Sequence, residues 1–130
     1  MKRDLDLVRT LLLCLENTKV PAGHALHLGP NELLIDGYEL EEVAYHIQLL
    51  KSAGFIRELG SKPSRYGLNY GGLSWEGHEF LDSVRDDAIW RNTRTAVSAV
   101  GGFTFDLVKD MAKAFLKAEF TRHTGLDLSS

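Results

Sequence analysis

Apolar residues recur at helical spacing in the stretch 39–54. They lie three or four positions apart and so fall on one side of a helix: Leu40, Val43, Ile47 and Leu50. Gly54 follows, and glycine readily adopts the left-handed conformation that ends a helix. Phe55 and Ile56 come next and are suited to a buried strand. The pattern predicts a central helix that stops at Gly54 and leads directly into a strand.

The residues before the central helix predict another helix and two short strands. One apolar face runs through the stretch 4–17, formed by Leu5, Val8, Leu12 and Leu15. The stretch 18–38 contains too many prolines and glycines for a long helix. We expect short strands at 25–28 and 32–36 instead.

Two segments after the central helix predict a β-hairpin, which we call the wing. Its strands are expected at 55–59 and 68–73, joined by the loop 60–67. Ser74 is suited to cap a following helix, expected from about Trp75 to Arg91. Small residues follow at 93–99, and the pair Gly101-Gly102 then predicts a break or hinge between helices.

A last helix is expected to begin near Thr104. Its apolar side is formed by Leu107, Met111, Ala114, Phe115 and Ala118. The elements together predict an α+β fold with a winged helix-turn-helix-like core, a β-wing and additional C-terminal helices. Residues 1–100 would form the winged-helix-like part and residues 101–130 a C-terminal helix with a frayed tail, in one compact domain overall.

Composition narrows the class of protein. The chain has 130 residues, of which 44% are hydrophobic and 25% charged, as in ordinary globular proteins. Its net charge of -3 argues against the broad basic surface of a strong nonspecific nucleic-acid binder. No apolar run approaches membrane-spanning length, so we expect a cytoplasmic protein that does not enter the membrane. Cys14 lies in an apolar run and is expected in the core.

Three segments resemble a known family. MKRDLDLVR at 1–9, AYHIQLLKSAGFI at 44–56 and LSWEGHEFLDSVRDDAIW at 73–90 are similar to domain-of-unknown-function family 2513. This resemblance implies a winged-helix-like domain of uncharacterised role in bacteria, sometimes encoded near phage genes, and it implies no catalytic residues. The segment 46–56 is also similar to the recognition helix and strand of many small bacterial repressors. The chain departs from these repressors at 18–38, where they usually carry a second short helix.

The central helix and the wing supply the candidate DNA contacts. The helix residues facing away from the apolar stripe include Tyr45, Gln48 and Ser52, with Lys51 nearby, and side chains of these types can contact bases or phosphates. The wing adds three cations: Arg57, Lys62 and Arg65. Four acids at 36–42 lie at the end of the helix that would normally approach the bases, where they would repel phosphates, so a solvated acidic face is an equally good interpretation.

Other kinds of site find less support. His24 and His27 have no further ligand at a suitable spacing, and zinc needs three or four, so we expect no metal. No phosphate-binding loop or nucleophile motif is present, so we expect no cofactor and no enzymatic activity. Trp75 and Trp90 are expected to anchor core contacts, or an interface if exposed.

Two functions follow as hypotheses. The first is a DNA-binding regulator, and the second is a protein-interaction module on the same scaffold, which the net acidity favours. The last helix also offers a surface for a homodimer through Leu107, Met111, Phe115 and Ala118. The alternative is that it folds back on the first helix of its own chain.

Overall fold

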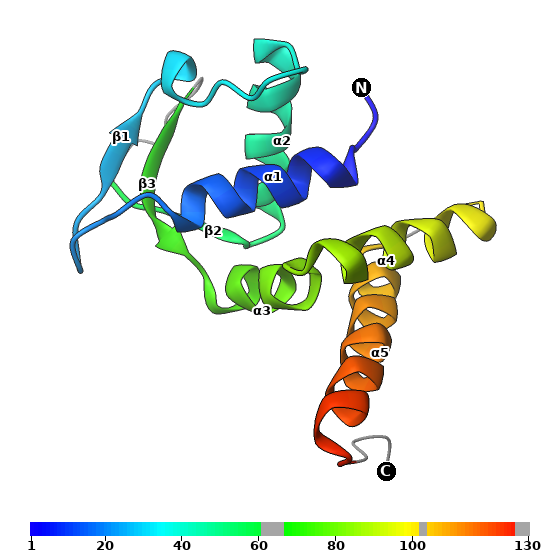
Figure 1. The fold of residues 1–130 in the computed structure, drawn as a ribbon. Helices are drawn as coiled ribbons and strands as arrows, with labels where there is room; N and C mark the ends of the chain where they lie inside the picture. The colour runs from blue at the N-terminus through cyan, green and yellow to red at the C-terminus, as the bar shows by residue number, and fades with distance from the viewer. Residues whose placement is uncertain (61–66, 102–103, 127–130) are drawn as a thin grey trace. The chain divides into compact units, whose positions relative to one another are not determined.

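Five α-helices and a small antiparallel sheet make up the part of the chain that the structure describes (Figure 1). The computed structural model describes residues 1–60, 67–101 and 104–126. The elements in chain order are α1 (Leu5–Glu16), β1 (Leu26–Leu28), the 3-10 helix η1 (Pro30–Glu32), α2 (Leu40–Ser52), β2 (Ile56–Glu58), β3 (Leu68–Leu73), α3 (Trp75–Val84), α4 (Asp87–Ala99) and α5 (Phe105–Thr124). The predicted α+β class is confirmed.

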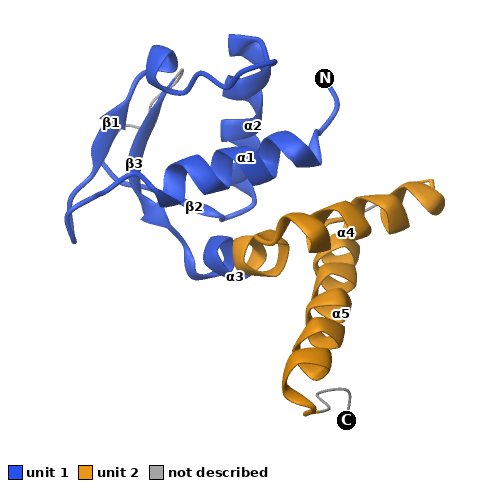
Figure 2. Cartoon of the chain, in the orientation of Figure 1, with its two compact units in different colours: residues 1–79 blue, residues 80–130 orange. Residues whose placement is uncertain are grey.

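The chain divides into two compact units, Met1–Glu79 and Phe80–Ser130 (Figure 2). The boundary falls inside α3. The first unit therefore contains α1, α2 and the sheet, and the second contains the α4–α5 pair.

The sheet of the first unit has the strand order β1-β3-β2, and both pairings are antiparallel. The central strand β3 pairs with β1 from Leu68 to Tyr70 and with β2 from Tyr70 to Leu73, with one register shift on β2. Tyr70 is 1% exposed, and its hydroxyl donates to the carbonyl of Leu15 at 2.7 Å. This bond ties the central strand to the end of α1.

Helices α1 and α2 are joined by a buried histidine. His46 is 1% exposed, and its Nε2 accepts from the backbone N–H of Asp4 at 2.8 Å. Its Nδ1 lies 2.8 Å from the carbonyl of Glu42 one turn earlier, so the ring donates there in its neutral form. The Asp4 carboxylate in turn caps α1 by accepting from Leu7 N–H and also accepts from the Tyr38 hydroxyl.

Several predicted elements need correction in this unit. The segment 32–36 is not a strand, because Pro30 starts the short helix η1. Leu40 is not a core residue: it stands in the first turn of α2 and is 40% exposed. The buried face of α2 also includes His46, whose two hydrogen bonds satisfy the ring. Cys14 is exposed rather than buried.

The predicted helix from Trp75 to Arg91 is two helices. Ser74 caps α3 as expected, since its Oγ accepts from Gly77 N–H at 3.0 Å. The chain leaves the helix after Val84, and Asp86 caps α4 by accepting from Ile89 N–H at 2.9 Å. Helix α4 then continues through the small residues at 93–99 and ends at Ala99.

Helices α4 and α5 pack against each other in the second unit. Helix α5 begins beside Thr104, as the sequence predicted, and the Thr104 hydroxyl caps it by accepting from Leu107 N–H at 3.2 Å. The fully buried positions of α5 are Val108 and Ala112. Gly125 ends the helix with a φ of 73°, a left-handed conformation that favours glycine.

Candidate nucleic-acid interface

The outer face of α2 is exposed, as the periodicity predicted. Glu41, Tyr45, Gln48 and Ser52 all face solvent, opposite a buried face formed by Val43, His46, Ile47 and Leu50. Tyr45 is 38% exposed, and the edge of its ring meets His46 with the centroids 5.7 Å apart. This face therefore offers two long polar side chains, Tyr45 and Gln48, on a helix whose opposite face is buried in the core.

Lys51 connects α2 to the hairpin. Its Nζ lies 3.0 Å from Oε2 of Glu58 on β2 and donates to the carbonyl of Gly67 at 3.2 Å. The same Glu58 oxygen accepts from Asn69 N–H on β3 at 3.0 Å. Both side chains of the ion pair are only 14% exposed. Lys51 thus acts as a clamp between helix and hairpin, and Glu58 neutralises its charge.

Of the three cations predicted for the wing, the structure describes Arg57. Arg57 is exposed on β2, between Ile56, which is buried, and Glu58. Lys62 and Arg65 lie outside the described residues. Arg57 is therefore the one wing cation within the described residues, and it directly precedes Glu58, the ion-pair partner of Lys51.

The acids at the start of α2 hold the helix end. Glu39 and Glu42 form a reciprocal capping box, with Glu42 accepting from Glu39 N–H at 3.3 Å. Negative charge here also complements the helix dipole. From Glu41 to Ser52 the helix rises by about 16 Å at 1.5 Å per residue. This exceeds the screening length of about 8 Å at physiological salt, so the acids act weakly on charges near the wing.

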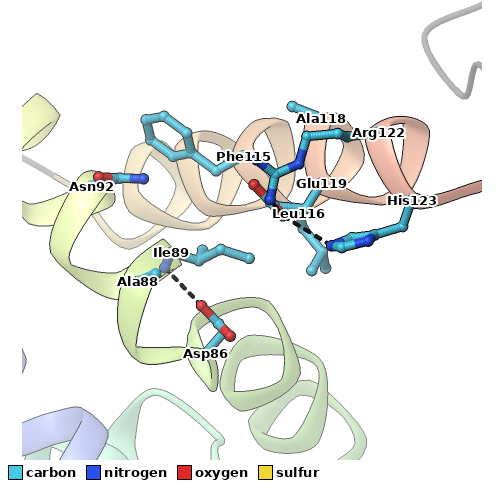
Figure 3. A pocket seen from close by; sticks show the side chains of 10 residues that line it. All are labelled: Asp86, Ala88, Ile89, Asn92, Phe115, Leu116, Ala118, Glu119, Arg122 and His123. Carbon is cyan, nitrogen blue, oxygen red and sulfur yellow. Dashed lines mark hydrogen bonds and ion pairs between the residues drawn. The ribbon is translucent and has the colours of Figure 1, made fainter.

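A separate open groove of about 400 Å³ lies between α4 and α5 (Figure 3). Its apolar lining is Ala88, Ile89, Phe115, Leu116 and Ala118. Several of its polar groups already have partners: Asp86 accepts from Ile89 N–H, and Glu119 lies 2.7 Å from Arg122 and 3.4 Å from His123. The groove is suited to an apolar group, and it brings together no nucleophile with a base.

The predicted dimer residues are only partly used by the fold. Leu107 is 39% exposed, Ala118 is exposed, and Met111 and Phe115 are partly buried. Helix α5 packs on α4, a partner that neither sequence hypothesis included. Of the two tryptophans, Trp90 is buried and Trp75 is 76% exposed.

Within the part of the chain that the structure describes, no three His, Cys, Asp or Glu side chains are grouped so that they could hold a metal ion. His27 instead pairs with the side chain of Asn69 at 2.8 Å. None of the helices described is both long and apolar enough to cross a bilayer.

Comparison with known proteins gives two matches. A family model described as "Hypothetical protein (DUF2513)" matches residues 2–104. An uncharacterized protein from Haemophilus influenzae is 34% identical over 118 residues, which cover 89% of this chain and 96% of that protein. No solved structure matches.

Proposed function

The chain belongs to the DUF2513 family, and we propose that it is a winged-helix protein that binds DNA without catalysing a reaction. The order of elements supports the winged-helix assignment. Helix α1 is followed by strand β1, then by α2, and then by the antiparallel hairpin β2–β3, with β1 pairing on the far side of β3. The single turn η1 stands where a helix-turn-helix has its second helix.

The observation that carries the proposal is the clamp between α2 and the hairpin. Because Lys51 bonds to Glu58 on β2 and to Gly67, the residue just before β3, the hairpin is held beside the last turn of α2. Gln48, Ser52 and Arg57 are each exposed, and the proposal is that the clamp holds them on one surface. A duplex could meet this surface with the helix towards the bases and the wing towards the phosphates.

The charge distribution decides which end of α2 would approach DNA. The acidic first turn would be repelled, whereas the last turn lies about 16 Å away, beside the cationic wing. Contact is therefore expected through the second half of α2 and the wing. Three wing cations give a salt slope of only about -3, so binding by one subunit would be weak.

A second candidate function is binding of a protein partner by the other end of the same helix. Large apolar side chains are exposed before and along the first half of α2: Leu34 (64%), Leu40 (40%) and Tyr45 (38%). Glu39 and Glu41 are exposed among them. Exposed apolar groups surrounded by acids are suited to a partner whose apolar surface is bordered by basic residues.

Fluorescence anisotropy with a labelled random-sequence duplex of about 30 base pairs tests the leading proposal. Arg57→Glu should weaken binding several-fold at low salt, because a phosphate contact becomes a repulsion. Arg91→Glu on α4 is the matched control, since it makes the same charge change at an exposed position outside the first unit. Equal affinity of the two variants, or no binding by the wild type, would contradict the proposal.

The second candidate is tested by a pull-down from nuclease-treated cell extract. Leu40→Glu should release a protein partner, while Arg57→Glu should retain it. Retention by Leu40→Glu would exclude the first half of α2 as the docking surface.

A further inference from the structure

An exposed apolar stripe runs along α5 beside the side that packs on α4. Its members are spaced four, three and four positions apart: Leu107, Met111, Ala114 and Ala118. At 100° per residue they fall within about 60° of the helix circumference. The buried residues Val108 and Ala112 lie on the neighbouring side. We call these four residues the α5 stripe.

The fold leaves the α5 stripe largely uncovered. Leu107 is 39% exposed, Ala114 and Ala118 are exposed, and Met111 is partly buried. Alternating steps of four and three are the spacing of residues at the contact of two helices in a left-handed coiled coil. The stripe is therefore patterned for a second helix in addition to α4.

We propose that the α5 stripe pairs with the same stripe of a second copy of the chain, with the two helices antiparallel about a two-fold axis. The axis would pass midway between Met111 and Ala114. Leu107 would then meet the partner's Ala118, and Met111 would meet the partner's Ala114. This inference is independent of DNA binding.

The sizes of the side chains favour the antiparallel orientation. The stripe has two large residues in its first half and two alanines in its second half. An antiparallel pair places a large residue against a small one in all four layers, which keeps the helix separation constant and fills the contact evenly. A parallel pair would place Leu107 against the partner's Leu107 and alanine against alanine, which would leave space at one end.

The charges beside the stripe favour the same orientation. Asp110 and Lys117 are exposed on the same edge, each one residue before a stripe position. In the antiparallel pair Asp110 lies opposite the partner's Lys117, and symmetry repeats this contact. In a parallel pair Lys117 would instead approach the partner's Arg122, so that like charges would meet. Electrostatic complementarity thus identifies a second copy as the occupant.

Analytical ultracentrifugation of the full chain at one to one hundred micromolar tests the pairing. A concentration-dependent dimer is expected. Asp110→Lys should raise the dimer dissociation constant about tenfold, because two ion pairs become two repulsions. Lys117→Asp should do the same, and the double variant Asp110→Lys with Lys117→Asp should recover wild-type association. Lys109→Asp, on the side of α5 opposite the stripe, is the matched control and should leave the dissociation constant unchanged.

Disulfide trapping tests the orientation. In a Cys14→Ser background, chains carrying Leu107→Cys are mixed with chains carrying Ala118→Cys and oxidised. A cross-linked heterodimer is expected, whereas each variant alone should stay largely uncross-linked. A monomer throughout the concentration range, no recovery in the charge-swapped double variant, or stronger cross-linking of Leu107→Cys alone would each overturn the proposal.

Discussion

Gly77 offers a sharp test of how the first unit is built. It lies in the first turn of α3 and directly faces the carbonyl of Phe55, the residue that joins α2 to β2. A Cβ at position 77 would lie 2.1 Å from that oxygen. The same carbonyl accepts from Ser74 N–H at 3.0 Å, and Ser74 also bonds to the Gly54 carbonyl, so α3 begins on the corner between α2 and β2.

Two opposing effects set the outcome of Gly77→Ala. Replacing glycine by alanine in a helix normally gains up to about 1 kcal/mol. Here the backbone carbonyl would have to retreat by roughly 1 Å, and overpacking of this kind costs about 1–3 kcal/mol or more. Because Phe55 is also fixed by its N–H bond to Leu50, the corner has little freedom to move. We expect a net destabilisation of about 1–2 kcal/mol.

Guanidinium unfolding followed by circular dichroism and tryptophan fluorescence measures this loss. Glu79→Ala is the control, because it alters an exposed residue of the same helix and should change stability by less than about 0.5 kcal/mol. If Gly77→Ala is as stable as the wild type or more stable, the close approach of α3 to Phe55 is wrong.

Two further predictions concern stability. Leu50→Ala should lower the free energy of unfolding by about 2–5 kcal/mol because Leu50 is buried, whereas Leu34→Ala, at an exposed position, should lower it by less than about 0.5 kcal/mol. Equal losses of the two variants in urea unfolding would mean that the buried face of α2 is assigned wrongly. Burial, and secondarily the charge of Glu16, raises the pKa of the Tyr70 phenol to about 12. The pKa of the phenol in the unfolded chain is about 10. The contribution of Tyr70 to the free energy of unfolding should therefore be fully present below pH 10 and fall by about 2–3 kcal/mol towards pH 12. Tyr70→Phe should remove that decline, and an unchanged alkaline decline would assign it to other groups.

The sequence predicts the parts of the fold that depend on local periodicity. The helix that became α2 and the strand β3 are where the apolar spacing places them, because each buries one face against neighbours. Ser74 caps α3 as expected, and α5 begins next to Thr104 as expected, since helix starts depend on residues within one turn.

The structure differs from the sequence prediction mainly where contacts between residues far apart in the sequence determine burial or pairing. His46 is polar, and its burial depends in part on a hydrogen bond from the Asp4 N–H, 42 positions away, which local periodicity does not reveal. Asp86 was predicted to lie inside one long helix. Asp is also a preferred N-cap residue, and its side chain here accepts from the amide three positions later. At the candidate interface, Lys51 was expected to contact DNA. Its pairing with Glu58 could not be predicted, because it requires the hairpin's position beside α2.

The salt dependence of DNA affinity tests the proposed function most directly. For the wild type, the logarithm of the association constant should fall linearly with the logarithm of salt concentration, with a slope of about -3 per subunit from Arg57, Lys62 and Arg65. Lys62→Glu with Arg65→Glu should abolish binding even at low salt, because two phosphate contacts become repulsions. The control, Lys19→Glu with Arg91→Glu, makes the same charge change at exposed positions elsewhere and should retain most of the affinity. A slope near zero, or equal binding by the two double variants, would contradict DNA binding by the wing.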